Sequence, residues 1–248
     1  MTIKVITQRS YTDGVYQEKF IKRSLSIIKI IALSLLFTIL VHFVSLGAFA
    51  ERLFPTFPEG ATANIIKLAY TIIAFIIIFW LLKRWNRSVN DTYMDHSVFS
   101  KKIWGYGIGG YIIIFVLSLV FLYVKQHIAA GPQESSRVIQ DRFFFEEGMF
   151  AAGITGLNTL IFSPILEEMT FRLGFLGQLV EEDIPQWIAI LGTSVVFAWF
   201  HGDIISQSFI TGIGLSILTL KSKSIYPAMI AHVLISTSVL VIRWYQYQ

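Results

Sequence analysis

Residues 157–180 read LNTLIFSPILEEMTFRLGFLGQLV, an apolar run that holds two adjacent carboxylates, Glu167 and Glu168, and one arginine, Arg172. A run of this length and hydrophobicity can cross a bilayer as a helix. Charged side chains at that depth raise the free energy of insertion by roughly 2.5–3.5 kcal/mol each, so they are rare and by default indicate a functional site. The stretch therefore predicts a membrane helix that carries part of such a site.

The composition predicts a membrane protein built from several helices. Of the 248 residues, 54% are hydrophobic and 15% are charged, whereas soluble domains have about 25% charged residues. The apolar runs are residues 25–50, 61–82, 104–124, 148–180, 186–201, 204–220 and 225–242. We therefore predict an all-α fold, a polytopic transmembrane bundle of about seven to eight spans. Since residues 148–180 would measure roughly 50 Å as one straight helix, we expect a kink near Pro164 or an amphipathic lead-in.

We expect two parts in the chain. Residues 1–142 would hold N-terminal membrane helices and loops, and residues 143–248 would form a catalytic core of four helices. Basic residues beside the spans, as in the segment 83–102, predict a multi-pass protein of the cell membrane with a cytoplasmic N-terminus. Orientation and contact with membrane lipids explain these charges, so the net charge of +4 does not indicate nucleic acid.

The charged residues of the central run divide into a pair and a single carboxylate. On a helix, Glu168 and Arg172 are four apart and share a face, so they can neutralise each other. Glu167 points about 100° away and is left to act as a general base. The structural alternative is an ion cluster that only joins two helices, and it applies more to Glu168 and Arg172 than to Glu167.

Two histidines in later apolar runs extend the pattern. His201 follows Phe197 by four residues, and His232 precedes Ser236 by four, so each pair shares a helix face. A single histidine in a membrane helix often makes only an interhelical hydrogen bond. One carboxylate and two imidazoles on three spans exceed what helix packing requires, so we expect Glu167, His201 and His232 to meet. Counting along the helices places the histidines at different depths, so this meeting requires tilted or broken helices.

The three motifs resemble those of the CPBP family, which comprises type II CAAX prenyl proteases and the bacteriocin-processing and self-immunity proteins of the Abi group. The motifs are Glu-Glu-x-x-x-Arg at 167–172, Phe-x-x-x-His at 197–201 and His-x-x-x-Ser at 232–236. The resemblance covers roughly residues 150–240 and implies an intramembrane endopeptidase. It implies that Glu167 activates water, that His201 orients it, and that Glu168 and Arg172 hold the site.

By the same resemblance, His232 and the fourth residue after it would stabilise the oxyanion. The family usually has asparagine at that position, and this chain has Ser236. A hydroxyl is shorter than an amide and offers one donor, so we expect it to serve less well.

The resemblance leaves the cofactor open between zinc, or another divalent metal, and a metal-free mechanism. Glu167, His201 and His232 are the candidate ligands, because two histidines and a glutamate form some catalytic zinc sites. There is no His-Glu-x-x-His helix, and the absence of cysteine excludes thiolate ligands.

We predict a glutamate-dependent peptidase that cleaves a small peptide or a lipid-anchored peptide, such as a bacteriocin, pheromone or CAAX-like precursor. One rival is an inactive family member that acts as a membrane scaffold or immunity factor. A second rival is a transporter, which should show repeated spans, and the sequence shows no such repeat.

Overall fold

The computed structural model describes residues 61–247 apart from 86, 95–96, 129–148 and 203–205, together with a few positions between residues 17 and 32. The predicted first span at 25–50 therefore lies almost entirely outside the described residues, as do the loop at 51–60 and most of the loop after the third span. Within the described residues the fold is helical throughout, which confirms the all-α class.

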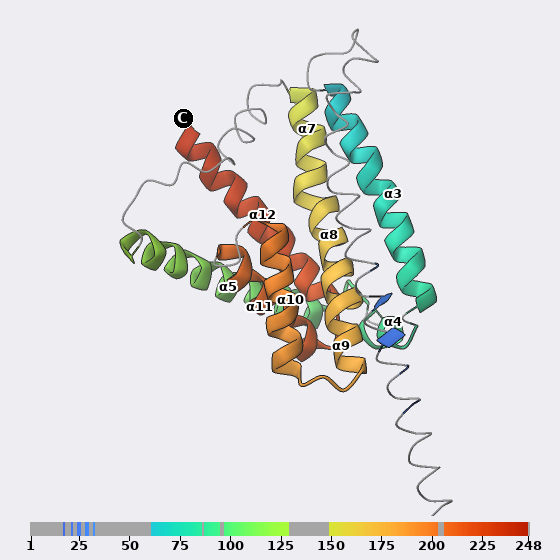
Figure 1. Cartoon of the computed structure of the whole chain (residues 1–248). Coiled ribbons are helices and arrows are strands. Elements are labelled where there is room, and N and C mark those ends of the chain that lie inside the picture. The colour runs from blue at the N-terminus through green and yellow to red at the C-terminus, as the bar shows by residue number, and fades with distance from the viewer. Residues whose placement is uncertain are drawn as a thin grey trace, which may run out of the picture.

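Helices follow one another along the chain and pack as a bundle (Figure 1). The first part has α3 (Ala61–Trp85), α4 (Arg87–Tyr93) and α5 (Lys101–Ile128). The second part has α7 (Met149–Leu157), η2 (Asn158–Phe162), α8 (Ser163–Glu168), η3 (Met169–Gly177), α9 (Gln178–Glu181), α10 (Gln186–Phe200), α11 (Gln207–Ser222) and α12 (Tyr226–Tyr247).

The helix around Pro164 continues through the proline. Segments α7, η2, α8, η3 and α9 follow each other without a break, and Figure 1 shows them along one rod. A proline inside a helix lacks the N–H donor and crowds the carbonyl one turn earlier. The wider π-helical turn of η2, which ends two residues before Pro164, gives this carbonyl room. We expected a kink near Pro164 or an amphipathic lead-in, and the structure has a π-helical segment before the proline.

Small residues let α5 approach α11 and α12 closely. A Cβ atom on Gly110 of α5 would lie 2.5 Å from Leu218 Cδ2, and one on Gly214 of α11 would lie 2.4 Å from Ile114 Cγ1. Side chains larger than hydrogen would force these helices apart. Such contacts are typical of helices that pack in a membrane, where close van der Waals contact contributes to association.

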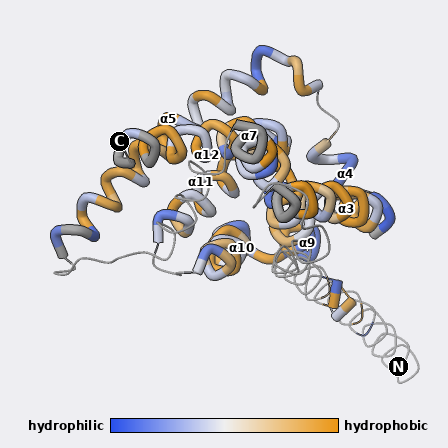
Figure 2. Tube along the Cα trace, turned by 90° about the horizontal axis from the view of Figure 1, so that it is seen from above, coloured by the Kyte–Doolittle hydropathy of each residue, from blue (hydrophilic) through white to orange (hydrophobic). Residues whose placement is uncertain are grey.

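The outward faces of the helices are apolar. Side chains such as Ile76 and Trp80 of α3, Ile113 of α5 and Trp199 of α10 are exposed, and Figure 2 shows hydrophobic residues along these helices. Of the helices that the structure describes, one, within Lys101–Lys125, is long and apolar enough to cross a membrane, and the count of seven to eight spans is not confirmed.

The turn between α11 and α12 offers a test of local backbone strain. Lys223 ends α11 in the left-handed conformation, with φ of 51°, a region that costs residues other than glycine about 1–2 kcal/mol. We expect Lys223→Gly to raise the free energy of unfolding by about 1 kcal/mol, because glycine adopts this conformation freely. Thermal unfolding in detergent micelles measures the change.

The matched control for this prediction is Lys221→Gly. Lys221 lies in the last turn of α11, where glycine should lower stability by about 1 kcal/mol. Equal losses in the two variants would contradict the prediction.

Candidate active site

Glu167 is the central carboxylate of the candidate site and projects from α8. Its Oε1 accepts a hydrogen bond from the Ser163 hydroxyl, one turn earlier, at 2.9 Å. Its Oε2 is buried and has no hydrogen-bond partner in the part of the chain that the structure describes. Burial of a carboxylate oxygen without a hydrogen-bond partner is unfavourable, and this oxygen is left able to accept a hydrogen bond from a bound molecule. The sequence patterns did not single out Ser163, although its spacing of four residues was the available signal.

Two imidazoles face this oxygen from separate helices. His201 Nε2 lies 3.6 Å from Glu167 Oε2, and His232 Nε2 lies 3.8 Å from the same atom. These distances exceed a direct hydrogen bond. The three predicted residues are thus brought together from the end of α10, the second turn of α12 and α8. Counting along straight helices placed His201 and His232 at different depths. The two histidines meet because α12 runs obliquely to the rod formed by α7 to α9 (Figure 1).

The second ring nitrogen of each histidine fixes its orientation. His201 Nδ1 lies 2.8 Å from the carbonyl oxygen of Phe197 and must donate to it, because a carbonyl only accepts. Gly202 follows with φ of 88° and ends α10 at this point. His232 Nδ1 lies 2.8 Å from Glu168 Oε1 and donates to that carboxylate. Both rings therefore direct Nε2 toward Glu167.

Glu168 and Arg172 form a buried ion pair beside the histidine. Both side chains are fully buried, and Arg172 Nε lies 3.1 Å from Glu168 Oε2. The contact is electrostatic, since its geometry is not that of an aligned hydrogen bond. Glu168 thus joins the guanidinium to His232, and the pairing predicted from the spacing of four residues is present.

Solvent exposure falls from one side of the site to the other. The side chains of His201, Glu167 and His232 are 29%, 13% and 8% exposed, and Glu168 and Arg172 are inaccessible. The site is therefore approached from the side of His201. Ser236 lies half-buried on α12, one turn after His232, and no hydrogen bond within the described part of the chain fixes its hydroxyl.

The proposed metal ligands do not form a recognisable metal centre. The residues that the structure describes contain no group of three or more His, Cys, Asp or Glu side chains arranged to hold a metal ion. Glu167, His201 and His232 converge, and we derive no step through a metal. Asp203, the residue two positions after His201, lies outside the described residues.

Part of the chain matches a known protein family. Residues 150–238 match the model of a family described as type II CAAX prenyl endopeptidase Rce1-like. This match supports a CPBP family intramembrane protease domain at residues 150–238. Searches of curated proteins and of solved structures gave no match.

The matched CPBP segment contains all three motifs, and the resemblance predicted from them is confirmed. This segment begins within α7 and ends within α12, so it includes every side chain of the site described above. The family is a membrane-embedded protease family, which supports a peptidase in the membrane. The single long apolar helix among the described residues is consistent with this location.

The ion pair in the CPBP segment can be tested by a double-mutant cycle. We expect Glu168→Gln and Arg172→Met each to lower the free energy of unfolding by about 3–5 kcal/mol, because each leaves an uncompensated buried charge. The double variant should lose less than the sum, since neither charge then remains. Thermal or denaturant unfolding in micelles measures the coupling.

Glu181→Gln is the control for this cycle, because Glu181 is exposed at the end of α9. Its stability should be nearly unchanged. Strictly additive losses in the two site variants would show that Glu168 and Arg172 do not act as a pair.

Proposed function

We propose that this protein is an intramembrane endopeptidase in which Glu167 activates a water molecule. The observation that carries the proposal is the position of Glu167 Oε2, which faces the Nε2 atoms of His201 and His232 at 3.6 and 3.8 Å. These separations are too long for direct hydrogen bonds, yet a water beside each pair can lie about 2.8 Å from both atoms. Such a water would be held by a base and an orienting imidazole.

The proposed reaction is hydrolysis of a peptide bond. Glu167 Oε2 takes a proton from the water while His201 Nε2 accepts the second hydrogen bond and orients it. The resulting hydroxide adds to the carbonyl carbon of the scissile bond and forms a tetrahedral oxyanion. Glu167 then gives its proton to the leaving nitrogen, the C–N bond breaks, and a carboxylic acid and an amine result.

His232 and Ser236 would stabilise the oxyanion. Because His232 Nδ1–H already donates to Glu168, its Nε2 donates only when the ring is an imidazolium. Protonated His232 and Arg172 would then balance the two carboxylates of Glu167 and Glu168. The Ser236 hydroxyl, one turn further along α12, would be the second donor.

The substrate we propose is a small membrane-associated peptide or a lipid-anchored precursor, of the bacteriocin, pheromone or CAAX-like kind. The apolar outward faces of α3, α5 and α10 suit a protein that receives its substrate from the membrane. The burial of Glu167 among apolar helices also keeps bulk water away from the site. A bound peptide would then react with a water molecule that the site itself holds.

The proposed role of Glu167 predicts a loss of turnover. We expect Glu167→Gln and His201→Ala to lower kcat by about 10²- to 10⁴-fold, because the amide cannot accept the proton and alanine cannot orient water. Protein in proteoliposomes is incubated with a leader-bearing bacteriocin precursor, a pheromone precursor and a farnesylated CAAX peptide, and products are followed by mass spectrometry.

His127→Ala is the matched control, because His127 is exposed on α5 and has no proposed role. Its cleavage rate should equal that of the wild type. Full activity in Glu167→Gln would overturn the mechanism.

Ser236 favours one second candidate function. Serine in place of the usual asparagine is consistent with a membrane scaffold or immunity factor that keeps the fold without cleavage. If the wild type cleaves none of the three probes while Glu167→Gln retains the biological activity of the protein, this second function is supported.

Substitution at Ser236 tests the oxyanion assignment directly. We expect Ser236→Ala to lower kcat by about 10²-fold with KM little changed, because a transition-state donor is lost. Ser236→Asn should raise kcat, because an amide reaches further than a hydroxyl. Steady-state kinetics on the probe that is cleaved gives both values, and equal kcat in all three proteins would remove Ser236 from the mechanism.

A further inference from the structure

The ring of Phe197 contacts three groups of the site at once. Its centroid lies 4.4 Å from that of His201 and 5.8 Å from that of His232, in a tilted and an edge-on arrangement respectively. The Arg172 Cζ atom lies over the same ring, 4.9 Å from its centroid. One apolar side chain therefore links α10 with η3 and α12.

The contact with Arg172 matters because the guanidinium is otherwise poorly satisfied. Arg172 is fully buried, and its Nη1 and Nη2 atoms have no hydrogen-bond partner among the described residues. A cation over an aromatic face is attracted by the ring quadrupole, and the attraction grows when both groups are desolvated. The face of Phe197 thus adds a favourable contact to the one that Arg172 makes with Glu168.

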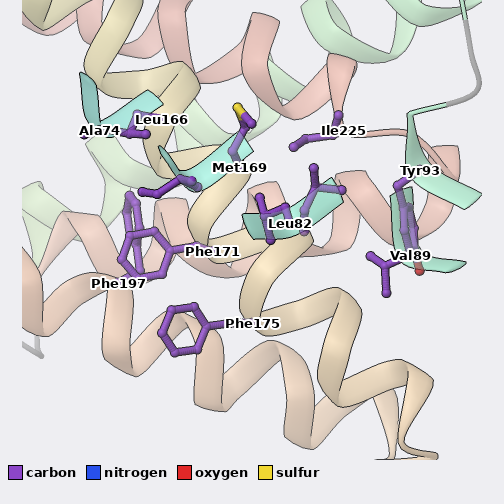
Figure 3. Packing of buried hydrophobic residues seen from close by; sticks show 12 residues of the cluster. Ala74, Leu82, Val89, Tyr93, Leu166, Met169, Phe171, Phe175, Phe197 and Ile225 are labelled. Atoms are coloured by element: carbon purple, nitrogen blue, oxygen red, sulfur yellow. The ribbon is translucent and has the colours of Figure 1, made fainter. Parts of the chain in front are cut away.

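Phe197 is itself held in place on two sides. Its ring is 1% exposed and meets Phe171 edge-on at 5.1 Å, and Figure 3 shows these rings side by side in the core with Phe175 nearby. Its backbone carbonyl accepts the Nδ1–H of His201 at 2.8 Å. Both the ring and the backbone of this residue therefore orient His201.

Gly212 of α11 lies against the Phe197 ring. A Cβ atom at Gly212 would lie 3.1 Å from the Cα and Cβ atoms of Ser194 and 3.3 Å from Cδ1 of Phe197. The absence of a side chain lets α11 lie close to α10, and a methyl group here would require Ser194 and the Phe197 ring to shift by a few tenths of an ångström. Helix α11 supplies no acid, base or imidazole to the site, yet it borders the residue that the imidazoles share.

We propose that Phe197 is a positioning residue that aligns His201, His232 and Arg172, and that Gly212 sets its position. The catalytic consequence rests on the proposed peptidase function, whereas the geometric consequence does not. Leucine at 197 would fill much of the volume but would offer no ring face to the three groups. Alanine at 212 would replace no side chain of the site, but its methyl group would crowd the Phe197 ring.

The test combines kinetics with a readout that is independent of activity. Wild type, Phe197→Leu and Gly212→Ala are reconstituted, and peptide cleavage is measured together with the rate at which diethyl pyrocarbonate modifies each histidine. His127, which is exposed on α5, is the internal reference. The control variant is Gly192→Ala on the same helix as Phe197, where a Cβ atom meets nothing within 4 Å.

We expect Phe197→Leu to lower kcat about 100-fold and Gly212→Ala about 10-fold, with KM little changed, because small displacements of catalytic groups have large effects. Modification of His201 and His232 should become several-fold faster relative to His127 in both variants. Gly192→Ala should match the wild type in both readouts. The Gly212 variant keeps the test decisive if Phe197→Leu does not fold.

The outcomes separate this proposal from the proposed function. If the wild type cleaves no probe but the two variants accelerate modification of both histidines, the positioning role stands and the peptidase function falls. If the wild type cleaves and both variants keep wild-type kcat and wild-type modification rates, the positioning role is overturned and the peptidase function stands.

Discussion

The whole site depends on the fully buried carboxylate of Glu168, which lies between an arginine and a histidine. Glu168 is fully buried, and its two oxygens face Arg172 Nε at 3.1 Å and His232 Nδ1 at 2.8 Å. A buried charge is tolerated only when such partners are in place. This requirement fixes α12 against α8, and it turns the other nitrogen of His232 toward Glu167. Glu168 therefore orients the imidazole that faces the Glu167 carboxylate.

The remaining architecture brings a third helix to the same point. The π-helical segments η2 and η3 lie on either side of α8, as is common near functional sites, and Gly202 ends α10 so that His201 lies at its terminus. Apolar side chains cover the outside of the bundle, so the polar groups are concentrated within. Polar residues collected inside an apolar exterior are typical of proteins that hold a polar site within the membrane.

Sequence patterns predicted much of this arrangement. The motif spacings indicated the pairing of Glu168 with Arg172 and the different direction of Glu167, because four-residue spacing on a helix determines which side chains meet. They could not predict the π-helical turns around Pro164, since the position of a π-helical turn depends on how the helix packs against its neighbours. The four-residue spacing of Ser163 and Glu167 was available as a signal for their hydrogen bond. The position of Arg172 over Phe197 could not be predicted, because contacts between separate helices depend on tilt. The roles of the site residues stay predictions.

The most direct test of the central claim is a distance measurement in the bilayer. Solid-state NMR can recouple ¹³C in glutamate carboxyl groups with ¹⁵N in histidine rings. The account predicts coupling of the Glu167 carboxyl carbon to Nε2 of both His201 and His232, because Glu167 Oε2 lies 3.6 and 3.8 Å from these nitrogens. It also predicts coupling of the Glu168 carboxyl carbon to Nδ1 of His232. Absence of coupling between Glu167 and either Nε2 atom would contradict it.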